Sequence, residues 1–69
     1  MAGNVYRLTS VVGTSDESVG DAIRTAVKTA SSSLRNLDWF EVNEIRGSVK
    51  AGDVTEFQVT LNLGFRYES

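Results

Sequence analysis

The fold is decided by residues 55–67, TEFQVTLNLGFRY, in which apolar and polar side chains alternate without interruption. This period of two predicts a β-strand with one buried face. The apolar set is Phe57, Val59, Leu61, Leu63, Phe65 and Tyr67, and the polar set is Glu56, Gln58, Thr60, Asn62, Gly64, Arg66 and Glu68. At about 3.3 Å per residue the strand is roughly 43 Å long, whereas a compact chain of this size is roughly 28 Å across. We therefore expect the strand to curl, its polar face to carry a site, and the chain to assemble.

The composition supports self-assembly of one small domain, residues 1–69, with net charge −2 and neither Cys nor His. A chain near this size buries only about 60% of its unfolded surface and is marginally stable alone. Disulfides and the usual zinc sites are excluded, and we predict no metal site, although carboxylate-only sites stay open. Oligomerisation is the remaining common source of stability.

Several partners and locations are disfavoured by the charge and hydropathy patterns. The acidic chain has no run of basic residues, so we expect no nucleic-acid partner. It has no apolar N-terminal signal and no apolar segment near the length of a membrane span, so we expect no membrane association and a cytoplasmic location.

The first half of the chain predicts a strand followed by a helix. Val5 to Val12 is rich in β-formers, and residues 13–15, Gly-Thr-Ser, are predicted to end it. Thr14 with Glu17 fits a capping box, and Ser15 is a competing N-cap. A helix of about four turns follows, because apolar residues recur at spacings of three and four: Val19, Ala22, Ile23, Ala26, Val27, Ala30 and Leu34.

Trp39 to Lys50 predicts a further strand whose apolar pattern changes phase. Phe40 and Val42 stand at even-numbered positions, whereas Ile45 and Val49 stand at odd-numbered ones. One extra residue near Asn43 or Glu44 would bring all four to one face, which is the signature of a β-bulge.

Residues 51–53, Ala-Gly-Asp, are predicted to form a three-residue hairpin turn. Ile45 and Val49 would then share the core face with Val59 and Thr55. A two-residue turn at Gly52 and Asp53 would expose the apolar set and is rejected. The predicted fold is α+β, with the order β-α-β-β and a three-stranded antiparallel sheet wrapped around one helix.

The bulge and turn together predict a group of polar and aromatic residues on the uncovered face of the sheet. In this register Trp39, Glu44 and Arg46 leave the core face and lie on the same side as Gln58. Taken alone, a Trp beside Phe40 is more often a core residue, and each of the others is more often solvated.

A resemblance to a known protein family suggests a function for this group of residues. The run LDWFEV at residues 37–42, EIRG at 44–47, VGTS at 12–15 and FQV at 57–59 together resemble the bacterial dodecins from Tyr6 to Glu68. The resemblance implies a hollow homo-dodecamer that binds flavins as stacked pairs between tryptophans of symmetry-related subunits. It implies FMN as the favoured flavin, with riboflavin as the other candidate, and coenzyme A as a further ligand of some members.

The resemblance also implies roles for four residues. Trp39 matches the tryptophan that stacks on the isoalloxazine ring, and Gln58 matches the glutamine that hydrogen-bonds its polar edge. Arg46 matches the arginine at the flavin site of bacterial members, and Glu44 matches, more loosely, an acidic residue near the ligand in archaeal members. An indole offers a large stacking face, and an amide offers both a donor and an acceptor.

Three functions are weighed on this basis. The leading one is flavin storage or sequestration, in which pairing with indoles quenches excited flavins and limits photochemistry. An oxidoreductase is disfavoured, because the chain lacks a catalytic motif and a sandwiched flavin leaves little room for a substrate, so we expect no enzyme. A structural shell or coenzyme A carrier is the third, and intact Trp39 and Gln58 argue against it.

Overall fold

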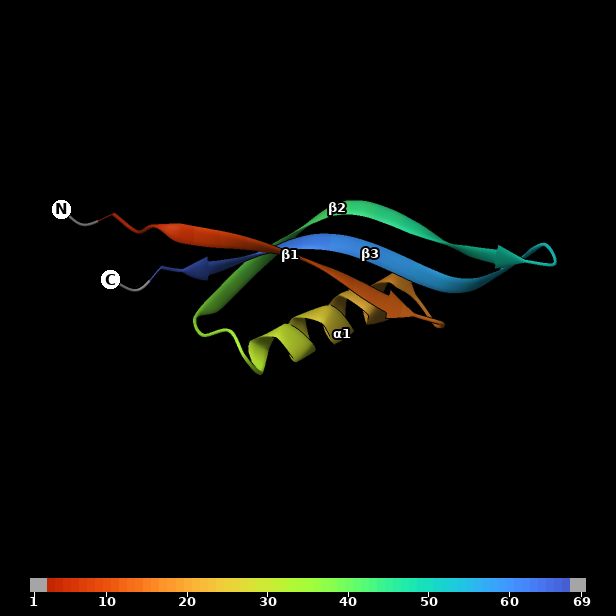
Figure 1. Cartoon of the computed structure of the whole chain (residues 1–69), viewed down its shortest axis with the longest axis horizontal. Helices are drawn as coiled ribbons and strands as arrows, with labels where there is room; N and C mark the ends of the chain where they lie inside the picture. Colours follow the sequence, from red (N-terminus) through yellow and green to blue (C-terminus); the bar gives the residue numbers. More distant parts are fainter. Residues whose placement is uncertain (1–2, 68–69) are drawn as a thin grey trace.

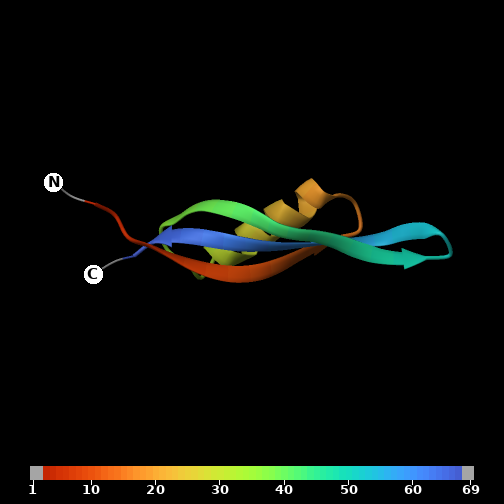
Figure 2. The ribbon, with the colours of Figure 1, turned by 90° about the horizontal axis from the view of Figure 1, so that it is seen from above.

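The computed structural model describes residues 3–67, so Glu68 of the predicted alternation lies outside the described residues. The elements are β1 (Tyr6–Ser15), α1 (Val19–Ser31), β2 (Leu37–Lys50) and β3 (Asp53–Arg66), in the order shown in Figure 1. Both strand pairs are antiparallel, and β3 lies between β1 and β2 (Figure 2). The predicted β-α-β-β order and three-stranded antiparallel sheet are confirmed.

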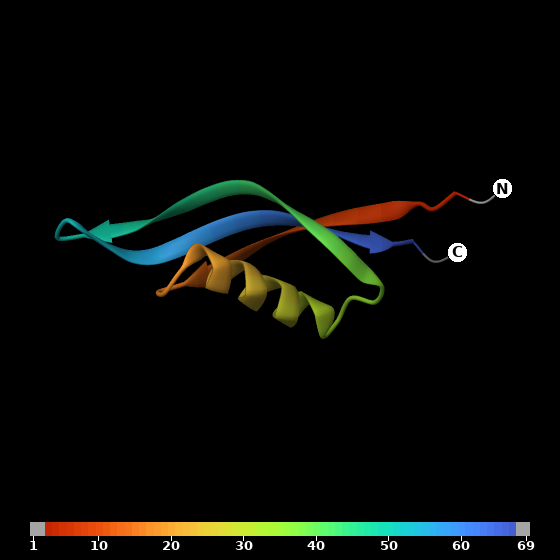
Figure 3. The same cartoon turned by 180° about the vertical axis from the view of Figure 1, so that it is seen from behind.

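The molecule is elongated rather than compact. Its extents are 57 × 20 × 14 Å and its radius of gyration is 14.4 Å, compared with about 11 Å for a compact chain of this length. Helix α1 lies along only part of the sheet, and the hairpin formed by β2 and β3 extends past it (Figures 1 and 3). The end of this hairpin is therefore uncovered within one chain.

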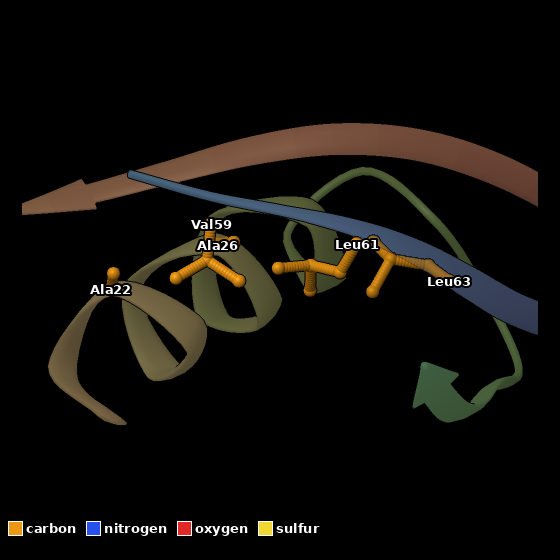
Figure 4. Packing of buried hydrophobic residues seen from close by; sticks show 5 residues of the cluster. All are labelled: Ala22, Ala26, Val59, Leu61 and Leu63. Atoms are coloured by element: carbon orange, nitrogen blue, oxygen red, sulfur yellow. The ribbon is translucent and has the colours of Figure 1, made fainter. Parts of the chain in front are cut away.

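The core lies between β3 and α1, as the alternation predicts. Val59, Leu61 and Leu63 are fully buried and pack with Ala22 and Ala26 (Figure 4). Burying a Val or Leu side chain fully contributes about 1.5–3 kcal/mol, so these positions supply much of the stability of one chain.

Strand β1 approaches the helix through its odd positions. Val11 packs against the core, whereas Leu8 and Val12 are exposed on the opposite face. A Cβ atom at Gly13 would overlap the carbonyl oxygen of Ala22. Glycine at this position therefore lets the helix backbone lie directly on the strand.

The predicted boundary between β1 and α1 is wrong in detail. Strand β1 continues through Gly13 to Ser15, and the N-cap is Ser18 rather than Thr14 or Ser15. The Ser18 hydroxyl accepts a hydrogen bond from the backbone N–H of Asp21 at 2.9 Å. Ser15 instead stabilises the turn before the helix, since its hydroxyl accepts from the backbone N–H of Glu17 at 2.9 Å and donates to the Asp21 carboxylate at 2.8 Å. Ser15 and Ser18 are both good capping residues. Because Ser15 is still paired with Phe57 of β3, the helix begins after Ser18.

Replacing Ser18 with alanine is expected to lower the free energy of unfolding by about 1 kcal/mol, because the amide of Asp21 loses its acceptor. Urea unfolding at a fixed chain concentration measures this change. Ser31→Ala is the matched control, since the Ser31 hydroxyl is exposed and bonds only the Lys28 carbonyl within its own helix. Equal destabilisation by both substitutions would contradict the capping role of Ser18.

The predicted bulge in β2 is confirmed. The register shifts between Val42 and Glu44, so that Asn43 is the extra residue. The apolar residues on either side pair with the core positions of β3: Phe40 with Leu63, Val42 with Leu61 and Ile45 with Val59.

The expectation that this apolar set of β2 is buried is wrong within one chain. Helix α1 packs mainly against β1 and β3. Strand β2 lies at the sheet edge, and Leu37 at its start packs against the core. Ile45 is 57% exposed and Val49 is 70% exposed. An apolar face and an unpaired strand edge therefore lie open together.

The predicted three-residue turn is also wrong. Ala51 and Gly52 form a two-residue loop with φ values of 53° and 80°, and Lys50 pairs with Asp53. Positive φ at both positions is the pattern of a type I′ turn, whose twist matches that of the flanking strands.

A further bulge near this turn restores the predicted parity. The register shifts again between Ser48 and Val49, which leaves Thr55 as an extra residue of β3. Ile45 therefore pairs with Val59 as predicted, whereas Val49 pairs with Val54 and not with Thr55.

Candidate functional site

The sheet face turned away from α1, called the open face here, carries all four predicted site residues. Trp39 pairs with Gly64, Glu44 with Thr60 and Arg46 with Gln58. These three positions of β3 alternate with the buried core positions, so their partners also lie on the open face. The bulge at Asn43 is what brings Glu44 and Arg46 to the same side as Trp39.

Trp39 rests on the backbone of the neighbouring strand. A Cβ atom built at Gly64 would overlap the indole carbons Cε2 and Cζ2, so the indole lies directly over this glycine. Trp39 is nevertheless 41% exposed. One side of the indole is supported by main chain, and much of the side chain stays available for stacking.

The sequence prediction missed two residues beside this indole. The Tyr6 ring meets Trp39 edge-on, with centroids 6.3 Å apart and an interplanar angle of 61°. Asp38 is linked to the indole indirectly, since the Tyr6 hydroxyl donates to Asp38 Oδ2 at 3.1 Å. Gly64 was a signal only for the close approach of the indole, since a glycine inside an alternating strand marks such an approach.

A second cluster on the open face is polar and forms a chain of hydrogen bonds. Arg46 Nε donates to Gln58 Oε1 at 3.0 Å, and Gln58 Nε2 donates to Glu56 Oε1 at 2.9 Å. Arg46 Nη1 lies 4.0 Å from Glu44 Oε1, and both of these side chains are mostly exposed. A long, exposed ion pair contributes little, so Gln58 is the better-fixed partner of Arg46.

The structure brings Arg46, Gln58 and Glu44 together but leaves Trp39 apart from them. Gln58 lies six positions along β3 from Gly64, which lies beneath Trp39. This is about 20 Å along the strand. Within one chain, Trp39 and Gln58 therefore belong to two separate groups on the open face.

In residues 3–67 no group of three or more Asp, Glu, His or Cys residues is placed to hold a metal ion. The single helix of this region is too short and too polar to meet the criteria for a membrane span.

Comparison with known proteins gives one consistent result. The dodecin family model matches residues 5–68. The dodecin of Thermus thermophilus is 50% identical over 66 residues, covering 96% of each chain. The dodecin structure from Streptomyces coelicolor is 52% identical with a TM-score of 0.93, covering 100% of this chain and 99% of that one. The dodecin structure from Streptomyces davaonensis is 47% identical with a TM-score of 0.91, covering 99% and 100%. On sequence and fold together, this chain belongs to the dodecin family.

Proposed function

We propose that this protein stores flavin, either FMN or riboflavin, as stacked pairs between Trp39 side chains of neighbouring subunits in a hollow homo-dodecamer. The main support is the position of Trp39: its indole rests on the Gly64 backbone, and the residue is still 41% exposed. A flat apolar ring is the ligand shape that such a surface favours. The resemblance to dodecins favours an isoalloxazine as this ring.

The separation of the two clusters supports a site shared between subunits. A flavin on Trp39 of one chain would meet Gln58 of another, since a single chain holds them about 20 Å apart. The Gln58 amide can pair with the N–H and C=O groups of the pyrimidine edge. Glu44, mostly exposed beside Arg46, is the most peripheral of the proposed binding residues.

The exposed surface of β2 supports assembly, and membership of the dodecin family favours oligomeric self-assembly. The strand is 14 residues long and is paired on only one side. Ile45 and Val49 expose apolar surface beside this edge. Long, unprotected strand edges with apolar faces are rare in proteins that stay monomeric.

Within this proposal the protein is a binding protein and not an enzyme. A flavin stacked between an indole and a second flavin has both ring faces covered, so a substrate cannot reach them. Sequestration beside an electron-rich indole would also limit the photochemistry of free flavin.

A coenzyme A-binding shell is the second candidate, and one cavity favours it. A hollow of about 260 Å³ at the chain end is bordered by Arg7, Arg35 and Arg66. Guanidinium groups bind phosphates with charge-assisted hydrogen bonds. This cavity includes no part of Trp39 or Gln58, so both ligands would have separate places.

The chromophore of the purified protein tests the proposed function. We expect flavin absorbance bands in the assembled protein and a mass matching FMN or riboflavin in the denatured supernatant. Apoprotein that also fails to take up either flavin in titration would contradict flavin storage. Released coenzyme A without flavin would favour the second candidate.

Arg46→Ala is expected to weaken FMN binding more than riboflavin binding, and added salt should narrow the difference. Arg46 is mostly exposed, and its guanidinium donates to Gln58 through Nε, so its outer nitrogens are placed to meet a phosphate. Fluorescence titration of both flavins at low and high salt measures the effect. Arg24→Ala on the exposed face of α1 is the control for net charge. Equal losses of affinity for the two flavins would reject phosphate recognition. Arg46 would then contact the flavin ring or hold Glu44 in place.

A further inference from the structure

The amide of Gln58 is held between two opposite charges. The Arg46 guanidinium donates to the amide oxygen at 3.0 Å, and the Glu56 carboxylate accepts from the amide nitrogen at 2.9 Å. Gln58 and Glu56 are both partly buried. Hydrogen bonds to ionised groups are stronger than those between neutral groups.

This arrangement fixes which end of the amide points which way. If the amide turned over, its NH₂ group would face the guanidinium and its oxygen would face the carboxylate, and both charge-assisted bonds would be lost. Each end still keeps one unused site, because an amide oxygen accepts two hydrogen bonds and an NH₂ group donates two. Gln58 therefore presents an acceptor on the Arg46 side and a donor on the Glu56 side.

We propose that Glu56 is a positioning residue that sets Gln58 to recognise a cyclic imide, the C=O and N–H edge that flavins carry. The inference rests on the proposed flavin function and assigns a role to a residue outside the predicted site. Glu56 does not contact the ligand. It acts by holding the amide nitrogen, so that the free lone pair of Gln58 Oε1 accepts the imide N–H and the remaining amide N–H donates to the adjacent carbonyl.

Glu56 has a matched control on the same face. Glu41 Oε1 accepts a hydrogen bond from Asn62 Nδ2 at 3.3 Å and belongs to neither the Arg46 nor the Trp39 cluster. Glu41→Ala removes the same charge and the same kind of bond as Glu56→Ala. A difference between the two variants therefore reports on Gln58 and not on net charge.

The test compares riboflavin with N3-methylriboflavin, in which the imide N–H is replaced by a methyl group. The whole assembled protein is titrated with each flavin and followed by fluorescence quenching. The original protein is expected to prefer riboflavin by about tenfold or more, because the methyl group leaves Gln58 Oε1 unpaired. In Glu56→Ala this preference should fall by about fivefold. Glu56→Gln keeps an acceptor oxygen and should lose less, and Glu41→Ala should keep the full preference.

The outcomes separate this inference from the function on which it rests. If the original protein prefers riboflavin and both Glu56 variants weaken the two flavins by the same factor, Glu56 has a merely structural role and the inference is wrong. If the original protein binds neither flavin, the proposed function fails first and this inference with it. Native mass measured on each variant confirms assembly, and the nearly isosteric Glu56→Gln carries the test if Glu56→Ala does not assemble.

Discussion

Replacing Trp39 with alanine is expected to weaken flavin binding by about 1–3 kcal/mol per ring while leaving the fold and assembly intact. The loss follows from removing the stacking surface that lies over Gly64. The fold should survive because Trp39 lies on the open face, away from the core between β3 and α1. Fluorescence titration of a sample whose native mass has been checked measures both quantities.

Trp39→Phe is the matched variant, since it keeps a smaller aromatic ring at the same position. It should bind flavin with an affinity between those of the original protein and Trp39→Ala. Loss of assembly with unchanged flavin affinity in Trp39→Ala would show that Trp39 is a packing residue, and the proposed site would be wrong.

Placing a charge at Ile45 is expected to break the assembly. Ile45 lies on the helix side of β2, where α1 leaves it 57% exposed, and Val49 and Val54 expose further apolar surface beside it. If a neighbouring subunit covers this surface, an aspartate there is buried without a partner, at a cost of about 3–5 kcal/mol at each contact. The native mass of Ile45→Asp should then fall to that of one, two or three chains.

Flavin binding should be lost together with the assembly, because the proposed site draws Trp39 and Gln58 from different chains. Light scattering after size-exclusion chromatography gives the mass, and titration of the same fractions gives the affinity. Ile45→Val is the control and should keep both, since a single methylene is removed. A fully assembled Ile45→Asp variant would contradict the role given to this face.

The architecture was predictable because its main signals are local. The alternation of residues 55–67 marks β3, and the phase change between Val42 and Ile45 marks the bulge at Asn43. Both signals follow from the alternation of side chains across a strand.

The turn between β2 and β3 was not predictable in the same way. Ala51 adopts a positive φ of 53°, which a residue with a Cβ atom rarely does. The compensating bulge at Thr55 leaves no mark in the apolar pattern. The exposure of β2 was also hidden, because the sequence shows which residues share a face but not how far a short helix reaches across it.

The sequence predicted which face of the sheet carries the candidate site, but not how the site residues are spaced on that face. Parity placed Trp39, Arg46 and Gln58 on one side of the sheet, and the strand pairing agrees. Their separation along β3 depends on the strand register. The sequence prediction gave a register but did not use it to work out this separation. Glu56 was missed as a partner of Gln58 although it stands two residues away on the same face, because a single carboxylate on the polar face of a strand carries no specific signal.

Native mass spectrometry of the protein during a riboflavin titration tests the proposed site between subunits, since it reports assembly and ligand on the same particle. We expect a dodecamer that takes up flavin to one per chain, preferentially in pairs, and no flavin on dissociated chains. A single chain that carries flavin, or a dodecamer that stays empty at saturating flavin, would contradict a site built between subunits around Trp39.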